Sequence, residues 1–246
     1  MDDGRSAEQA LSFGGAVEEY ERARPTYPRE AADWAIPPTA KTVVDVGAGT
    51  GKFTRSLVAK GLEVFAVEPD DTMRGTLATS LPGVTALAGT AEHLPLPDDS
   101  VDVVTVAQAW HWMDHEAAKA EFARVLRPGG TLALVYNIRD ERVDWVRELG
   151  AIMHRSEAER LLEDEVTIGA PFGPIEIAQF DWAMLSNLDA LIELVKSRSY
   201  VITATAAERE RYFDGIRNLV ATDPELMLRD SFPLPYSTFV FRAQLG

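Results

Sequence analysis

Residues 43–51 read VVDVGAGTG, so a run of β-branched apolar residues changes abruptly into a glycine-rich loop, and few folds accommodate that change. The glycines at positions 47, 49 and 51 adopt positive φ at little cost and let a ligand approach the backbone closely. If a helix follows the loop, its first N–H groups favour a carboxylate or a phosphate. The pattern therefore predicts a strand, a loop and a helix, with a ligand bound at the loop.

A second apolar run, Glu63–Val67, ends directly before Glu68. An acidic side chain at the end of the second strand of such a unit can accept hydrogen bonds from both ribose hydroxyls of a nucleoside. The alternative interpretation is a tight turn followed by a surface glutamate. The order of strand, loop, helix, strand and acid favours nucleoside binding.

Short β-branched runs alternate with helix-like stretches in the first half of the chain, which predicts βαβ units and a parallel sheet. The runs are nearly continuous, so both faces of the sheet are expected to be covered. We predict strands at Thr42–Val46, Glu63–Val67, 84–88, Val101–Ala107 and 131–136. Helices are predicted to end near Gly61 and to span 72–80 and 114–126, the last being halted by the sequence RPGG at 127–130.

The second half is less regular, with helices predicted over 141–165 (broken near Gly150), 190–196 and 206–220 and strands over 175–182 and 238–242. The expected fold class is α/β: a doubly wound, mostly parallel seven-stranded sheet with helices on both faces, an N-terminal cap segment and a partly helical C-terminal half. We expect a single domain in three parts. These are a cap segment at 1–36, a cofactor-binding core at 37–138, and residues 139–246, which complete the sheet and contribute to the substrate pocket.

The net charge of -15 argues against nucleic acid and anionic membranes as partners, because phosphate-binding proteins usually carry clusters of Lys and Arg. No apolar run has the length of a membrane span, and the acidic N-terminus lacks the apolar segment of a secretory signal. With 0 cysteines, the chain has neither disulfides nor a cysteine nucleophile. A cytoplasmic location is expected, whereas these features leave the oligomeric state undetermined.

The spacing of the loop glycines distinguishes between two cofactors. Dinucleotide-binding loops read G-x-G-x-x-G, whereas this loop reads G-x-G-x-G and Asp45 precedes its first glycine by two residues. At this point the chain resembles the class I S-adenosylmethionine-dependent methyltransferases, in particular the small-molecule branch with trans-aconitate methyltransferase and other type 11 domains. The resembling segments are FGGAVEEYERARPTYP, VVDVGAGTGKFT, VFAVEPD, GTAEHLPLPDDSVDVVTVAQAWHW and VLRPGGTLALV.

The resemblance implies S-adenosylmethionine as cofactor, S-adenosylhomocysteine as product, and a role for each matched position. The residues that would border the methionine moiety are Asp45, Gly47, Ala48, Gly49 and Gly51. Glu68 would hold the ribose, and the residues near the adenosine and its adenine ring would be Pro69, Asp70, Thr90, Ala91 and Glu92. The passage from cofactor to acceptor would be lined by Ala107, Gln108 and Trp110.

The N-terminal segment carries Phe13, Val17 and Tyr20 at helical spacing, and Arg24-Pro25 ends that run. In the proteins that this chain resembles, the segment folds over the cofactor, which implies cofactor contacts from Tyr20 and Arg24. The alternative is an amphipathic helix that only packs on the domain.

Methyl transfer from a sulfonium is an in-line displacement, so the main task of the enzyme is to align the nucleophile with the methyl group. A hydroxyl nucleophile also benefits from a base. His111 follows the fourth predicted strand and is the candidate catalytic base; the alternatives are orienting the acceptor and a structural role. Trp110, His111 and Trp112 would form the substrate pocket. His111 and His115 lie four apart, but no third ligand is evident, so no metal is expected.

Three other functions are compatible with parts of the sequence. An NAD(P)-dependent oxidoreductase shares the sheet, but the glycine spacing fits poorly and no Tyr-x-x-x-Lys pair occurs. An amine-directed nucleic-acid methyltransferase would carry Asn/Asp-Pro-Pro-Tyr where this chain has AQAW at 107–110. A protein that binds S-adenosylmethionine without turnover also remains consistent. The aromatic and Met side chains of 139–235 favour an apolar small-molecule acceptor, while methylation of oxygen, nitrogen or carbon is left open.

Overall fold

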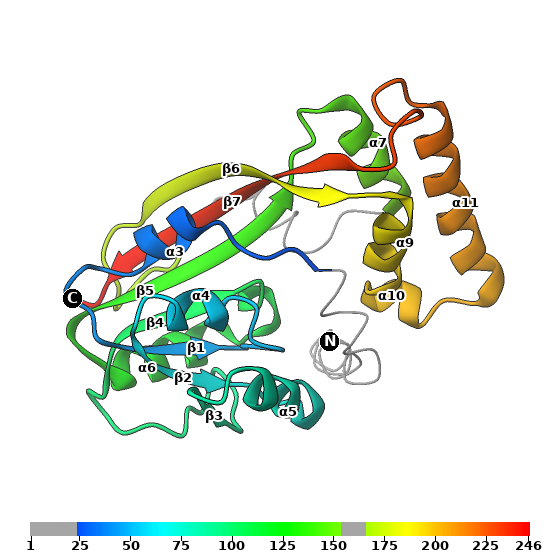
Figure 1. The fold of residues 1–246 in the computed structure, drawn as a ribbon. Helices are drawn as coiled ribbons and strands as arrows, with labels where there is room; N and C mark the ends of the chain where they lie inside the picture. The colour runs from blue at the N-terminus through cyan, green and yellow to red at the C-terminus, as the bar shows by residue number, and fades with distance from the viewer. Residues whose placement is uncertain (1–23, 154–165) are drawn as a thin grey trace.

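Seven strands form one sheet in the order β3-β2-β1-β4-β5-β7-β6 (Figure 1). The computed structural model describes residues 24–153 and 166–246, so Phe13, Val17, Tyr20 and the second half of the predicted 141–165 helix lie outside the described residues. The parallel strands are β1 (Thr42–Val46), β2 (Glu63–Val67), β3 (Thr85–Leu87), β4 (Val101–Ala107) and β5 (Leu126–Arg139). β7 (Phe232–Gln244) runs antiparallel to β5 and to β6 (Glu176–Ser186). This confirms the predicted doubly wound, mostly parallel seven-stranded fold.

The order of the strands reverses between β1 and β4, which are hydrogen-bonded neighbours although two strands separate them in the chain. In open α/β sheets, ligands bind outside the carboxyl ends of the strands at such a point. The residues that directly follow β1, β2 and β4 therefore define the edge at which a site is expected.

Helices cover both faces of the sheet. One face packs against α3 (Arg29–Ala35), α4 (Thr54–Val58) and α5 (Asp71–Ser80). The other packs against α6 (His115–Val125) and against the buried loop residues Leu94 and Ile168. Val43 belongs to the first core and Val44 to the second, as the alternation of side chains along a strand requires. The continuous burial of β1 is thus the result of two separate cores.

A third core lies where β6 and β7 extend past the parallel strands (Figure 1). It is built by the helical group, which we define as α7 (Asp144–Met153), α9 (Leu188–Lys196), α10 (Ser199–Ile202) and α11 (Ala206–Thr222). Leu149, Leu194 and Leu219 of this group pack with Phe232 and Leu234 of β7. The helical group lies on the side toward which β1 and β2 point (Figure 1), so the predicted partly helical second half is placed beside the carboxyl edge.

β5 begins at Leu126 rather than at residue 131, because the RPGG sequence forms an irregularity within the strand instead of a turn. Leu126 pairs with Val101 and Thr131 with Val103, and a register shift absorbs the residues between them. Gly129 has a φ of +73°, which glycine adopts without strain. A bulge of this kind interrupts the ladder but keeps the direction of the strand.

β7 is longer than the predicted 238–242 strand in spite of Pro233 and Pro235. Both prolines pair with β6, but they precede Tyr236, where pairing with β5 begins. The Pro235 carbonyl accepts the N–H of Asp140 at 3.0 Å. A proline is tolerated in a strand where its missing N–H would face no ladder partner.

Two features add to or correct the predicted pattern: a helix, α3, lies within the predicted cap segment, and the helix predicted over 141–165 is not broken at Gly150. In α3, the side chains of Ala31, Ala32 and Ala35 are buried, and the Arg242 guanidinium of β7 lies 4.3 Å from the centre of the Trp34 ring. This helix depends on contacts with distant strands, which its own short sequence does not reveal. α7 continues through Gly150 to Met153. None of the described helices combines the length and hydropathy that crossing a bilayer requires.

Candidate active site

The glycine-rich loop after β1 has the backbone conformation that its sequence predicts. Gly47, Gly49 and Gly51 have φ values of +66°, +57° and +88°. The N–H groups of Gly47 and Ala48 donate to the Val67 carbonyl at 2.9 and 3.1 Å. The loop is therefore tied to the end of β2, directly beside Glu68.

Glu68 lies between the loop and the start of α5, and its residue is 6% exposed. Its Oε2 accepts the N–H of Gly49 at 2.8 Å, and its Oε1 accepts the N–H of Asp70 at 2.9 Å. Burial raises the pKa of Glu68, although the two N–H donors oppose that shift. Asp70 in turn caps α5 by accepting the N–H groups of Thr72 and Met73. The carboxylate that is predicted to bind ribose is thus held at the carboxyl end of β2.

The Asp45 side chain, two residues before the first loop glycine, is held by two hydroxyl groups. Its Oδ2 accepts the Thr54 hydroxyl at 2.6 Å and its Oδ1 accepts the Thr105 hydroxyl at 2.9 Å. Burial raises the pKa of Asp45 to about 6 in spite of these donors. The carboxylate joins β1 to β4 and to the start of α4, and its predicted contact with the methionine moiety stays a prediction.

The segment after β4 packs directly on the loop. A Cβ atom on Gly47 would lie 2.7 Å from Cβ of Ala109 and 3.5 Å from Cε of Met113. The short 3₁₀ helix η2 (Trp110–Trp112) follows. Trp110 is buried in the core below α6 and stacks on His115, with the ring centres 4.2 Å apart. The indole thus belongs to the hydrophobic core, and the predicted contribution of Trp110 to the substrate pocket stays a prediction.

His111 is mostly buried on η2, with its ring 4.8 Å from that of Trp112 and 6.4 Å from that of Tyr136. Its Nδ1 is buried, and no described residue forms a hydrogen bond with this atom. Burial, together with the charges of His115 and Arg24, lowers the pKa of His111 to about 4. The side chain is therefore a neutral imidazole at pH 7, with an unused hydrogen-bonding atom beside the loop.

Tyr136 is a polar side chain at this edge that the sequence motifs do not single out. It lies on β5 and is 0% exposed, and its hydroxyl is buried without a hydrogen-bond partner among the described residues. Burial raises the pKa of Tyr136, so the phenol stays protonated and can donate. In the sequence it is the last residue of the fifth predicted strand, and only its hydroxyl distinguishes it from an ordinary core aromatic.

Residues 24–26 are anchored at the same edge. Gln108, with a φ of +58°, donates from Nε2 to the Asn137 carbonyl at 2.7 Å. Asn137 donates from Nδ2 to the Thr26 carbonyl at 2.7 Å. Arg24 donates from Nη2 to the Ser197 carbonyl at the end of α9, at 2.9 Å. Arg24 thus bridges to the helical group, and its predicted contact with the cofactor stays a prediction.

The remaining predicted cofactor residues follow β2 or β3 at the same edge. Ala91 is buried in the core, whereas Pro69 and Thr90 are exposed. Glu92 accepts the N–H of Asp114 at 3.0 Å, which joins its loop to the start of α6. Among the residues that the structure describes, no three His, Cys, Asp or Glu side chains are grouped to hold a metal ion.

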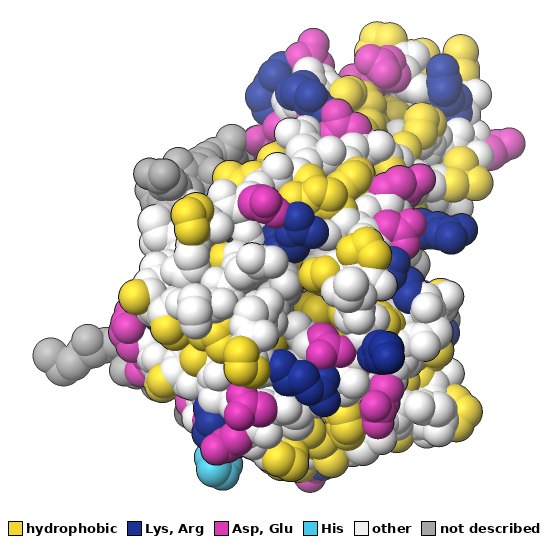
Figure 2. All heavy atoms as spheres, turned by 90° about the vertical axis from the view of Figure 1, so that its left-hand side faces the viewer, with side chains coloured by type: hydrophobic (Ala, Val, Ile, Leu, Met, Phe, Trp, Pro, Cys, Tyr) yellow, Lys and Arg dark blue, Asp and Glu magenta, His cyan; other side chains and the backbone are white. Residues whose placement is uncertain are grey.

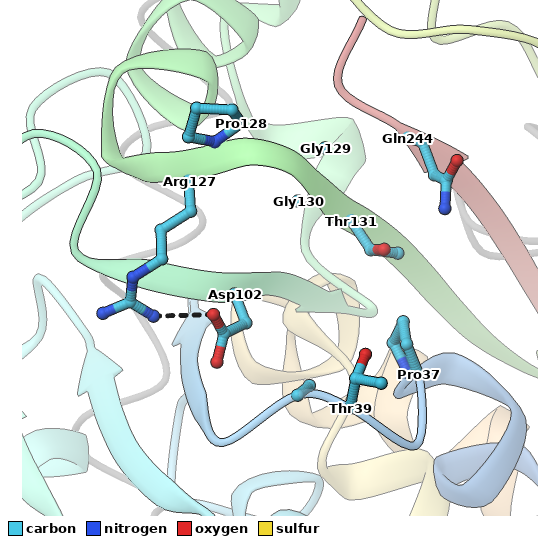
Figure 3. Close-up of a pocket in the computed structure, with 10 residues that line it drawn as sticks. Pro37, Thr39, Asp102, Arg127, Pro128, Gly129, Gly130, Thr131 and Gln244 are labelled. Carbon is cyan, nitrogen blue, oxygen red and sulfur yellow. Dashed lines mark hydrogen bonds and ion pairs between the residues drawn. The ribbon is translucent and has the colours of Figure 1, made fainter.

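A hollow of about 220 Å³ lies at the opposite edge, at the amino ends of β4 and β5 (Figure 3). Arg127 and Asp102 form an ion pair there at 2.7 Å, and Asp102 also accepts the N–H groups of Lys41 and Thr42. Burial would raise the pKa of Asp102, but these donors together lower it. On the face of the molecule shown in Figure 2, Lys and Arg side chains are interspersed with Asp and Glu side chains. This hollow is thus held by a structural ion pair, away from the edge at which parallel sheets bind ligands.

Comparison with known proteins extends these observations to the whole chain. The methyltransferase domain family matches residues 44–134, from β1 into β5. A protein of Mycobacterium tuberculosis, described as an uncharacterized methyltransferase, is 51% identical over 239 residues, which cover 97% of this chain and 98% of that protein. The chain is a class I S-adenosylmethionine-dependent methyltransferase. The oxidoreductase and the non-catalytic alternatives are therefore set aside.

The methyltransferase is also similar to a solved structure from Anaeromyxobacter dehalogenans, designated a type II methyltransferase. That likeness has a TM-score of 0.60 and 26% sequence identity and covers 90% of this chain and 97% of the other. A malonyl-[acyl-carrier protein] O-methyltransferase of Methylococcus capsulatus is 41% identical over 103 residues, which are 39% of this chain and 37% of that protein. The likeness to trans-aconitate methyltransferase within the family stays a prediction.

The site fits S-adenosylmethionine. Glu68 presents a carboxylate at the end of β2, where the two ribose hydroxyls can donate to it. The loop glycines have the positive φ values that let a ligand approach their backbone. The cofactor is cationic at sulfur, and the edge carries the carboxylates of Glu68 and Asp70.

Proposed function

We propose that the methyltransferase transfers the methyl group to an oxygen atom of a small-molecule acceptor, by in-line displacement at the edge between the glycine-rich loop and η2. The observation that carries this proposal is His111, a buried neutral imidazole whose segment packs on Gly47. The name of the Methylococcus relative, an O-methyltransferase acting on a small carrier-bound acid, supports the same class. That relative matches less than half of this chain, so its acceptor is not transferred here.

S-adenosylmethionine supplies an electrophilic methyl group on a leaving group that is already activated. The chain's own residues hold and align the reactants. Gly49 and Glu68, which are joined by a hydrogen bond, would hold the cofactor, and the residues near its adenosine would be Pro69, Asp70, Thr90, Ala91 and Glu92. His111 accepts a hydrogen bond from the acceptor hydroxyl and takes its proton as the new bond to oxygen forms.

The low pKa of His111 is compatible with this role. An imidazole with a pKa of about 4 is too weak a base to remove a proton from a resting alcohol. The proton on an oxygen that has just gained a methyl group is far more acidic than an imidazolium. Proton transfer to His111 is therefore downhill once methyl transfer is under way.

The test replaces His111. Turnover is followed as S-adenosylhomocysteine released with a panel of small hydroxyl, amine and carboxylate acceptors. We expect His111→Ala to lower turnover by ~10²-fold or more with a working hydroxyl acceptor, as is usual for loss of a general base. The affinity for S-adenosylhomocysteine should stay within about 0.5 kcal/mol of wild type. His111→Gln should restore acceptor binding but not the rate.

Two outcomes would contradict the role of His111. If the alanine variant loses cofactor affinity in step with its melting temperature, the residue is structural. If glutamine restores the full rate, His111 orients the acceptor and takes no proton. Because burial keeps the pKa of His111 near 4, kcat/KM should show no inflection at pH 6.5 from this residue.

A further inference from the structure

Two polar side chains of the site are buried without a described partner, and they lie on different elements. Nδ1 of His111 on η2 and the hydroxyl of Tyr136 on β5 are both sealed from solvent. Their ring centres are 6.4 Å apart, with an angle of 33° between the ring planes. Buried polar groups in native proteins are almost always hydrogen-bonded, so two such neighbours point to a ligand that is bound between them during function.

The protonation states of the pair restrict the ligand. Burial lowers the pKa of His111 and raises that of Tyr136, so both side chains are uncharged at neutral pH. A carboxylate has no proton to donate to a neutral imidazole acceptor, and an ammonium group would be buried beside the positive charge of Arg24. Arg24, whose charge acts on His111, donates to the Ser197 carbonyl at the end of α9. A neutral hydroxyl, which donates one hydrogen bond and accepts another, matches an imidazole acceptor and a phenol donor.

The surroundings of the pair restrict the rest of the ligand. Tyr136 belongs to the apolar core that also contains Val106, Leu134 and Ile168. Its ring makes an edge contact with Phe241, at 6.4 Å between the ring centres. The Tyr136 ring is therefore surrounded by apolar side chains, which favours a ligand whose hydroxyl is attached to an apolar frame.

We propose that His111 and Tyr136 form the acceptor subsite of the methyltransferase, and that it takes an uncharged hydroxyl group on an apolar frame, such as a phenol. The inference rests on the proposed function and adds the class of acceptor and a second contact residue. In this subsite the acceptor hydroxyl donates to Nδ1 of His111 and accepts from the Tyr136 hydroxyl. When the O–CH₃ bond forms and the S–CH₃ bond breaks, the hydroxyl proton passes to Nδ1 and the sulfur electron pair stays on S-adenosylhomocysteine.

The experiment uses three probes of equal frame: 4-propylphenol, its methyl ether 4-propylanisole, and 4-propylbenzoate. Their dissociation constants are measured by ligand-observed NMR on wild-type enzyme saturated with S-adenosylhomocysteine. We expect the phenol to bind at least ~10-fold more tightly than the ether, because one hydrogen bond of this kind corresponds to roughly that factor. The benzoate should bind more weakly than the phenol.

Tyr136→Phe removes only the hydroxyl and keeps the ring. We expect it to weaken phenol binding by ~10-fold, because the phenol oxygen loses the hydrogen bond from the Tyr136 hydroxyl, and to leave the dissociation constant of S-adenosylhomocysteine unchanged. The variant should also melt about 2–4 °C higher, because an unpaired buried hydroxyl is removed from the ligand-free protein. Tyr236→Phe is the matched control, because Tyr236 is also a buried tyrosine but lies on β7. Its ring stacks on that of Trp182, with the ring centres 5.4 Å apart. This control should leave the dissociation constant of the phenol unchanged.

Several results would overturn the subsite. These are tightest binding of the benzoate, equal binding of the phenol and the ether to the wild-type enzyme, an unchanged dissociation constant of the phenol in Tyr136→Phe, no binding of any probe, or a lower melting temperature of Tyr136→Phe with unchanged phenol binding. The last would mean that the hydroxyl serves the fold through a bound water. The proposed function fails separately, if phenols bind in a Tyr136-dependent manner but no S-adenosylhomocysteine forms from S-adenosylmethionine.

Discussion

Asp45 carries a buried carboxylate whose ionisation opposes folding. Burial raises its pKa from 3.8 to about 6, so between these pH values the folded protein binds this proton more tightly than the unfolded chain does. The stability that protonated Asp45 contributes to the folded protein is therefore lost as the pH rises through this window. The loss amounts to about 3 kcal/mol. Asp45→Asn should lack this fall. Urea denaturation of both proteins from pH 4 to 7 tests the prediction, and parallel stability curves would contradict it.

Glu68 has two tasks that substitution can separate. Its carboxylate holds the N–H groups of Gly49 and Asp70 and is the proposed ribose ligand. Glu68→Ala should weaken S-adenosylhomocysteine binding by ~10-fold or more and should also cost about 1–3 kcal/mol of stability, because two N–H donors lose their partner. Calorimetric titration and urea denaturation measure the two effects. Asp71→Asn, at an exposed neighbouring carboxylate, is the control and should change neither. An unaltered dissociation constant for Glu68→Ala would remove Glu68 from the cofactor site.

At this scale, the sequence predicts the residues whose role depends on backbone conformation and misses those whose role depends on burial. The loop glycines predict a backbone with positive φ, and the position of Glu68 directly after a strand predicts its role in ribose binding. The burial of Trp110 under α6, and the lack of a partner for the Tyr136 hydroxyl among the described residues, depend on which distant residues surround them. A single sequence does not contain that information.

Among the elements, the contact between the glycine-rich loop and η2 is the one that brings the cofactor edge and His111 together. Gly47→Ala would place a Cβ 2.7 Å from that of Ala109, in addition to the strain of a φ of +66°. Gly61→Ala is a matched control, because Gly61 has a φ of +75° and nothing within 4 Å of the added atom. We expect the control to cost about 1–2 kcal/mol and Gly47→Ala to cost more, with loss of S-adenosylhomocysteine affinity. Equal costs in urea denaturation, with affinity retained in both variants, would show that Gly47 is needed for its φ alone.

The element boundaries that the sequence predicts well are those of short strands buried on both faces. Thr42–Val46, Glu63–Val67 and Val101–Ala107 have the predicted bounds because their apolar runs end at a turn. β5 and β7 extend past Pro and Gly residues that normally mark turns. In β5 a register shift accommodates these residues, and in β7 the prolines precede the residues that pair with β5. α3 exists through contacts with β6 and β7, so local periodicity does not indicate it.

In the whole molecule, two long strands connect the cofactor edge to the helical group. β5 pairs with β4 along one side and with residues 236–244 of β7 along the other, while the start of β7 supplies Phe232 and Leu234 to the third core. The Arg24–Ser197 and Asn137–Thr26 hydrogen bonds join the N-terminal segment to both parts. The division at residues 36 and 138 remains a proposal, and these connections favour cooperative behaviour of its three parts.

Cooperativity can be tested by truncating one core at a time. Leu194→Ala opens a cavity in the helical group, and Leu57→Ala opens one against the sheet; both residues are buried, at 1% and 0% exposure. Each substitution should cost about 2–5 kcal/mol and lower the melting temperature by at least about 4 °C. Because β5 and β7 run through both parts, calorimetry should show one transition in each variant, and S-adenosylhomocysteine should raise the midpoint of both. A separate early transition in Leu194→Ala that the ligand does not shift would show that the helical group unfolds independently of the cofactor edge.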